Sequence, residues 1–133
     1  MKTIYFVIFC ILSIILCCKP NKEEPPVPLH TVVDGYVRDS SNNNPIIKLE
    51  IHLSKQKKYG YPDGDAILFR CNTDSNGYYK IDENIIPEKD YTYTIGTYGN
   101  ELYHRGSVQP SGYYEITPGQ NKTINIYLLR TGK

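Results

Sequence analysis

Tryptophan is absent from this chain of 133 residues, and methionine occurs only at its start. The lack of tryptophan argues against a sugar-binding module, because Trp is the usual aromatic platform in such modules. Cysteine is also scarce beyond the amino-terminal segment, where only Cys71 remains, so a disulfide within the domain is excluded. Ile67 and Phe69 precede Cys71 at a spacing of two, which predicts a buried thiol on an apolar strand face.

An excess of charge of either sign is missing as well. The chain has 15 basic and 14 acidic residues, and removal of residues 1–17 would remove only Lys2, leaving 14 against 14. Nucleic-acid binding requires a concentration of Lys and Arg, so we expect no nucleic-acid partner.

Residues typical of metal sites and active sites do not gather at useful spacings. The three histidines, His30, His52 and His104, fit no metal-ligand spacing, and His52 is expected to face outward from a strand. No Ser, His and acid trio or pair of carboxylates stands out. We therefore expect no metal, no cofactor and no enzymatic activity, and a hydrolase is the least favoured class.

No apolar run is long enough to span a membrane. Residues 4–16 are thirteen uncharged residues after Lys2, whereas a spanning helix needs about 20. The run fits a signal peptide, and Ile15-Leu16-Cys17-Cys18 resembles the lipobox of bacterial lipoproteins. The resemblance implies cleavage after residue 17 and lipidation of Cys18. Cys17 is a less favoured lipid site, because the large Leu16 would then precede the cleavage. The alternatives are an ordinary cleaved signal and a signal anchor.

Residues 18–30 are rich in proline and charge and are expected to form a tether rather than a folded segment. Within them, Lys22, Glu23 and Glu24 resemble the export signal of Bacteroidota lipoproteins, which implies display on the outer face of the outer membrane. The alternatives are solubilising charge and a domain that faces the periplasm.

Residues 31–133 are expected to form one all-β domain. The 13 tyrosines, with Ile and Thr, prefer extended backbone, and no segment has an apolar period of 3.6 residues over helical length. Residues 47–53 alternate strictly, which predicts that Ile47, Leu49, Ile51 and Leu53 face inward. Similar inward rows are Val33, Gly35 and Val37; Ile67, Phe69, Cys71 and Thr73; Tyr79 and Ile81; Tyr91, Tyr93 and Ile95; and Ile124, Ile126 and Leu128.

Turn residues separate these rows, and residues 74–77 are expected to form a turn after which the next strand pairs back. The pattern predicts a seven- to eight-stranded antiparallel Greek-key β-sandwich, with a small barrel as the alternative. The order of Gly35-Tyr36-Val37-Arg38-Asp39, Thr73-Asp74-Ser75-Asn76-Gly77-Tyr78-Tyr79 and Ile86-Pro87 resembles the carboxypeptidase regulatory-like domain, a transthyretin-like (prealbumin-like) sandwich. The resemblance covers about residues 32–98.

The connection over residues 55–65 is longer than this family needs, and surface loops often carry binding groups. It holds three lysines together with Tyr59 and Tyr61, which would suit an acidic glycan or protein. Other tyrosines, Tyr36, Tyr78, Tyr98 and Tyr127, are expected on outward rows. The leading hypothesis is a membrane-anchored lipoprotein whose sandwich is a non-catalytic interaction or spacer module, and the alternative is a glycan-binding accessory lipoprotein that uses loop tyrosines.

Overall fold

The computed structural model describes residues 24–59, 66–100, 102–104 and 113–130. Within these residues the chain is all-β, and no helix is found that could cross a membrane. The strands are β1 (Leu29–Asp39), β2 (Glu50–Lys57), β3 (Ala66–Asn72), β4 (Tyr78–Ile85), β5 (Tyr91–Gly96), β6 (Tyr103–His104), β7 (Tyr113–Ile116), β8 (Asn121–Thr123) and β9 (Ile126–Arg130).

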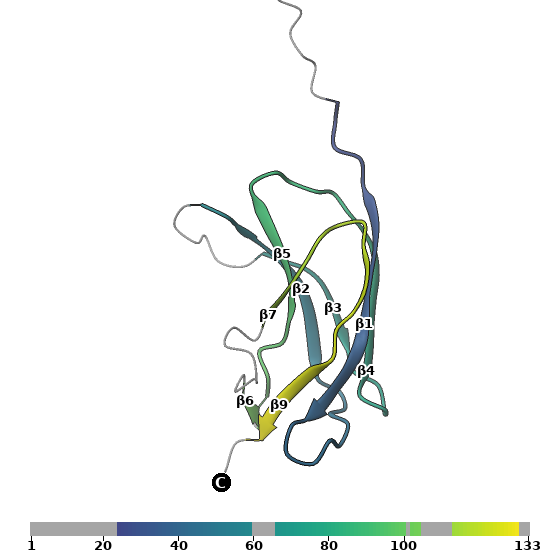
Figure 1. The fold of residues 1–133 in the computed structure, drawn as a ribbon, viewed down its shortest axis with the longest axis vertical. Coiled ribbons are helices and arrows are strands. Elements are labelled where there is room, and N and C mark those ends of the chain that lie inside the picture. Colours follow the sequence, from purple (N-terminus) through teal and green to yellow (C-terminus); the bar gives the residue numbers. More distant parts are fainter. Residues whose placement is uncertain (1–23, 60–65, 101, 105–112, 131–133) are drawn as a thin grey trace, which may run out of the picture.

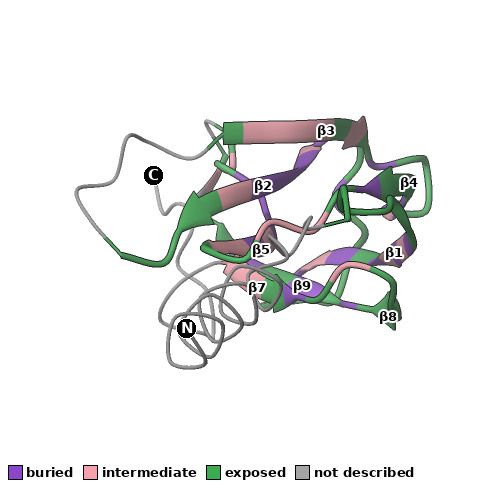
Figure 2. Ribbon diagram, turned by 90° about the horizontal axis from the view of Figure 1, so that it is seen from above, coloured by how far each residue is buried: buried purple, intermediate pink, exposed green. Residues whose placement is uncertain are grey.

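The strands form two sheets that pack face to face (Figure 1). One sheet has the order β4-β1-β9-β6, with β8 paired to β1, and the other has the order β3-β2-β5-β7. Seen from above, the layer with β2 and β3 lies apart from the layer with β1, β8 and β9 (Figure 2). β4 returns beside β1, and β5 beside β2, which is the non-sequential pairing of a Greek key.

The sequence had led us to expect antiparallel sheets, but the pairing is not antiparallel throughout. β1 pairs in parallel with both β8 and β9. The reason is that the last segment of the chain runs in the same direction as the first and fills the remaining edge of β1. The other pairings between strands are antiparallel.

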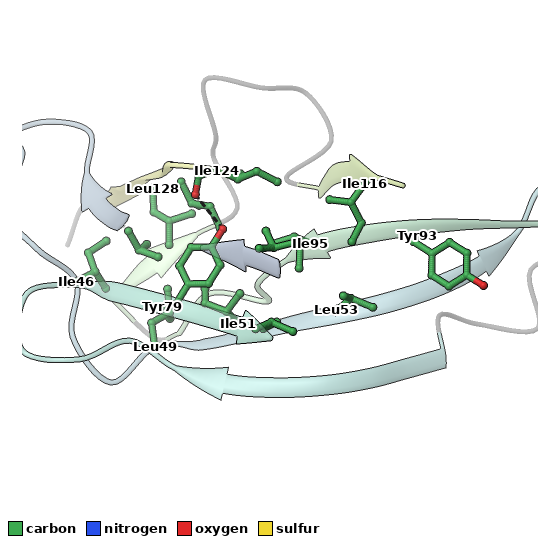
Figure 3. Packing of buried hydrophobic residues seen from close by; sticks show 14 of the residues in the cluster. Ile46, Leu49, Ile51, Leu53, Tyr79, Tyr93, Ile95, Ile116, Ile124 and Leu128 are labelled. Carbon is green, nitrogen blue, oxygen red and sulfur yellow. Dashed lines mark hydrogen bonds between the residues drawn. The ribbon is translucent and has the colours of Figure 1, made fainter. Parts of the chain in front are cut away.

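The core lies between the sheets and is built from the alternating positions of their inner faces (Figure 3). Tyr79 is the largest of the fully buried side chains, and its hydroxyl donates a hydrogen bond of 2.8 Å to the carbonyl of Ile124. This bond satisfies the one polar atom that burial of the side chain would otherwise leave without a partner. The predicted inward residues Val33, Val37, Leu49, Ile51, Leu53, Tyr79, Ile81, Tyr93, Ile95, Ile124, Ile126 and Leu128 are all buried.

Ile47 was predicted to face inward, and this prediction is wrong. Its side chain is 51 % exposed, and Ile46 is buried in its place. Lys48 has a φ of 54°, so the chain is not extended there and the alternation is interrupted. β2 begins only at Glu50. Leu49, Ile51 and Leu53 therefore keep their predicted inward position, while Ile47 does not.

The inward row of β3 also differs from the prediction. Leu53 pairs with Phe69, whereas Ser54 pairs with Ile67, so Leu68 is an extra residue that forms a bulge. Leu68, Phe69 and Cys71 pack against the core, and Ile67 pairs with the outward Ser54 instead. Cys71 is half-buried rather than buried because β3 is an edge strand, and this burial raises the pKa of its thiol.

The turn at residues 74–77 forms as predicted, with Gly77 at a φ of +73°. The strand after it does not pair back on β3, however. β4 pairs with β1 in the opposite sheet, so the turn carries the chain across the sandwich. A side chain at position 77 would also meet the backbone, because an added Cβ would lie 2.6 Å from the carbonyl oxygen of Val37.

The two ends of the sandwich differ in what they carry. β1 begins at Leu29, opposite Ile85, two residues before the expected start of the domain. The chain before β1, the end of β2 and the connection from β4 to β5 lie at one end, which we call the tether end (Figure 1). β1 and β9 run away from it and finish at the opposite end, which we call the far end.

Candidate functional site: the tyrosine–arginine face

The loop with Tyr59, which the sequence had marked for ligand binding, begins at the tether end. Tyr59 is 83 % exposed, and no ring contact involving it is found in the described part of the chain. The loop is shorter than expected because residues 55–57 belong to β2. Lys55 is engaged there: its ammonium group pairs with Glu88 and lies 4.7 Å from the ring centroid of Tyr91.

Lys55 and Glu88 also border an apolar cavity of about 250 Å³ between the two sheets at the tether end. Its walls come mainly from Leu68 and Phe69 of β3 and from Ile85 and Ile86 at the end of β4. Packing between the two sheet edges accounts for the apolar side chains that line the cavity. The cavity is therefore part of the core and is not our candidate site.

His52 was expected to face solvent, and this prediction is wrong. It does lie on the outer side of β2, but its side chain is fully buried. The chain beyond β5 folds back over this side of the sheet, and the ring of Tyr98 stacks on the imidazole at 4.4 Å. Tyr113 of β7 meets the same ring edge-on at 6.0 Å. The cluster therefore covers the sheet at His52.

A second group of aromatic side chains remains open to solvent. It lies on the outer side of the sheet β4-β1-β9 and consists of Tyr36, Arg38, Tyr78 and Tyr127, which together we call the tyrosine–arginine face. Tyr36 pairs with Tyr78 across the strands, and Arg38 pairs with Tyr127. Tyr36 and Tyr127 are each 40 % exposed, and the pairing places all four side chains on adjacent positions of one sheet surface.

Alternation along β1 produces this face. Val33, Gly35 and Val37 point inward and are buried, so Tyr36 and Arg38 must point outward. Gly35 permits the close approach of the segment between β8 and β9, because an added Cβ would lie 1.9 Å from the carbonyl oxygen of Ile124. The side-chain oxygen of Asn125 then accepts the N–H of Tyr36 at 3.0 Å, which fills the gap between the two parallel pairings.

The rings and the guanidinium group contact one another. The centroids of Tyr36 and Tyr78 are 5.3 Å apart with their planes at 57°, and Arg38 Cζ lies 5.3 Å from the centroid of Tyr36. Arg38 Nη1 also donates a hydrogen bond of 3.0 Å to the carbonyl of Asn43 in the loop after β1. The arginine is thus held both by a ring and by a carbonyl, which reduces the entropy lost on binding a ligand.

Polar groups border the face on the side toward the tether end. Asp34 accepts a hydrogen bond of 2.8 Å from Thr123 Oγ1 and one of 3.3 Å from the hydroxyl of Tyr78. Partial burial and the carboxylate of Asp34 both raise the pKa of Tyr78, burial being the larger cause. Tyr78 therefore stays a neutral hydrogen-bonding group throughout the physiological range.

The other residues that the sequence suggested are spread over the chain. Cys18, Lys22, Glu23 and Tyr61 lie outside the described residues, and Glu24 is exposed ahead of β1. The described residues hold no group of three or more His, Cys, Asp or Glu side chains that could bind a metal ion. Sequence reasoning placed Tyr36, Tyr78 and Tyr127 on outward rows but missed Arg38, whose signal was its position two residues after Tyr36 on the same alternating strand.

Comparison with known proteins adds little to this geometry. No protein-family model and no curated protein matches the chain. Among solved structures, the chain is similar to 3-chlorocatechol 1,2-dioxygenase from Rhodococcus opacus 1CP, with a TM-score of 0.41 and 15 % sequence identity. The match covers 84 % of this chain, which spans 62 % of the dioxygenase chain. Neither the activity nor the residues of that enzyme can be transferred at this level of similarity.

Proposed function

We propose that the protein is a lipid-anchored lipoprotein of the outer membrane whose transthyretin-like sandwich is a non-catalytic binding module. The anchor and the location rest on the lipobox-like sequence at Cys18 and on Lys22, Glu23 and Glu24. The observation that supports binding is the tyrosine–arginine face, because Tyr and Arg, together with Trp, are enriched among the residues that dominate binding energy.

The position of the face favours this proposal. Tyr36 and Arg38 are seven and nine residues beyond Leu29 in β1, which at about 3.3 Å per residue puts them roughly 23–30 Å from the start of the strand. A module anchored through residue 18 would therefore hold this face away from the membrane. Tyr59 would instead lie on the membrane side of the module.

Binding can be tested with the purified full-length protein in detergent on glycan and protein arrays. We expect one ligand class to be captured, and we expect Tyr36→Ala combined with Tyr127→Ala to weaken capture at least tenfold. Tyr59→Ala is the matched control, since it also removes an exposed tyrosine but from the tether end. Capture that is lost with Tyr59→Ala would move the site, and an absence of any ligand would favour a spacer.

Surface display can be tested by protease treatment of intact cells. We expect the protease to remove the domain from wild-type cells and to spare it when Lys22, Glu23 and Glu24 are all changed to Ala. If intact cells protect the wild-type domain while lysed cells do not, the domain faces the periplasm.

A further inference from the structure

We infer that Arg38 is a pre-oriented receptor for a carboxylate, and that the ligand of the tyrosine–arginine face is a glycan that carries carboxylated sugars. This inference rests on the proposed function and names its ligand class.

Arg38 makes no ion pair with any described residue. Its contacts are the carbonyl of Asn43 and the ring of Tyr36. Other cations nearby are engaged: Lys80 on β4 pairs with Asp82 at 2.6 Å. The acidic residue on the same side of β1, Asp34, is four positions away, roughly 13 Å along a strand, and it already accepts two hydrogen bonds.

The orientation of the guanidinium group suits a carboxylate. A guanidinium has five N–H donors in a planar fork, and among the described residues only a neutral carbonyl uses one of them, at Nη1. The remaining donors can bind both oxygens of one carboxylate in parallel, an arrangement that is stronger and more specific than a single contact. A phosphate monoester carries nearly two negative charges and is better matched by several cations, whereas this face offers one cation without an acidic partner among the described residues.

The surroundings favour a sugar over a protein. A protein interface needs about 20–30 residues on each side and an apolar centre. The face has four side chains, in which the rings of Tyr36, Tyr78 and Tyr127 occupy strand positions next to one charged group, that of Arg38. Hydroxyl groups and aromatic rings match the hydroxyls and C–H groups of a pyranose, and the guanidinium matches its carboxylate.

The test is calorimetric titration of the full-length protein in detergent with trigalacturonic acid and with its methyl ester, in which an uncharged ester replaces each carboxylate. A glycan array with uronate-, sialate- and neutral-terminated sugars extends the test to the whole class. We expect at least tenfold tighter binding to the carboxylated form of the preferred sugar. Arg38→Gln should remove this difference, and Arg38→Lys, which keeps the charge but loses the fork, should retain only part of it.

Arg70→Gln is the matched control, because Arg70 is an exposed arginine on the other sheet and pairs with Glu50 at 2.9 Å. It should leave both affinities unchanged. Equal binding of acid and ester, or binding of no carboxylated glycan, would overturn the inference while the proposed binding function could still hold for another ligand. Tighter, Arg38-dependent binding of a pentaglutamate peptide would overturn the choice of a glycan. Capture that is insensitive to the Tyr36→Ala and Tyr127→Ala changes would move the binding site away from this face, and capture of no ligand at all would overturn the proposed binding function itself.

Discussion

The imidazole of His52 stacks on the ring of Tyr98, with the two centroids 4.4 Å apart and the planes 22° from parallel. His52 lies on the outer side of its strand, where the alternating pattern predicts exposure, and it is nevertheless fully buried. The stacking therefore shows that the segment after β5 belongs to the packed structure and acts as a cover on the sheet.

Removal of the Tyr98 ring should destabilise the fold although Tyr98 itself is largely exposed. Tyr98→Ala would remove an aromatic pair and expose the imidazole, at a cost of about 1–2 kcal/mol in the free energy of unfolding. Urea denaturation measures this change, with Tyr59→Ala as a control that should cost less than about 0.5 kcal/mol. Equal effects from the two changes would mean that the segment does not pack on the sheet.

The inner face of β2 can be tested with two isoleucines. Ile51 is fully buried, so Ile51→Ala should cost about 2–5 kcal/mol through lost burial and a residual cavity. Ile47 is half-exposed ahead of the strand, so Ile47→Ala should cost less than about 1 kcal/mol. Denaturant midpoints of the two variants compare the costs directly. A larger cost at Ile47 would mean that its side chain faces inward, as the alternating sequence predicts.

Gly35 should tolerate no side chain. The Cβ of an alanine would lie 1.9 Å from the carbonyl oxygen of Ile124, and that neighbour is backbone, so β1 and the β8–β9 segment would have to separate. We expect Gly35→Ala to cost about 3 kcal/mol or more, measured as the shift in thermal or denaturant midpoint. A variant as stable as the wild-type protein would refute the close approach of these segments.

Acid should weaken the turn that follows β1. Asp39 accepts hydrogen bonds from the hydroxyl and the N–H of Ser41, at 2.6 and 2.8 Å, and these bonds lower the pKa of its carboxyl group. A lowered pKa in the folded state stabilises the fold fully above the ordinary Asp value of about 3.9, and the contribution disappears as the pH falls through the lowered value. The gap in denaturant midpoint between the wild-type protein and Asp39→Ala should thus stay constant from pH 8 to about pH 5 and shrink below about pH 4. A gap that widens in acid would contradict this assignment.

Lipidation depends on the thiol of Cys18. Cys18→Ala should abolish labelling with a fatty-acid probe and release the protein from the membrane, because each buried methylene of an acyl chain contributes about 0.8 kcal/mol to anchoring. Cys17→Ala serves as the control and should still be labelled. If labelling is lost with Cys17→Ala and kept with Cys18→Ala, the lipid is attached one residue earlier.

The sequence predicts most of the strands because inward and outward positions alternate locally along them. Ile51, Tyr79 and Leu128 are buried for this reason. The exceptions arise where one residue breaks the alternation. The positive φ of Lys48 turns Ile47 outward, and the bulge at Leu68 exchanges Ile67 for Leu68. Neither break changes the hydrophobic pattern, so the pattern could not reveal them.

Which strands pair, and which segments cover a sheet, depend on contacts between distant parts of the chain. The sequence gives little indication of such contacts. Nothing in residues 74–77 indicates that β4 pairs with β1 rather than with β3. Burial of His52 depends on Tyr98, and the setting of Arg38 depends on Asn43 and on the turn that presents its carbonyl. The outward tyrosines could be predicted one by one, whereas their assembly with Arg38 required the register of three strands.

The parallel pairing of β1 with β8 and β9 has a consequence for how the protein is made. Val37 faces Ile126, so the strand synthesised first acquires its second neighbour only when nearly the whole chain is available. Contacts so distant in sequence slow folding, because a long loop must close before any of them forms. Until then one edge of β1 stays open to strands of other chains. A chain shortened before β8 would keep that open edge permanently, and we expect it to aggregate or to exchange strands between copies rather than to fold alone.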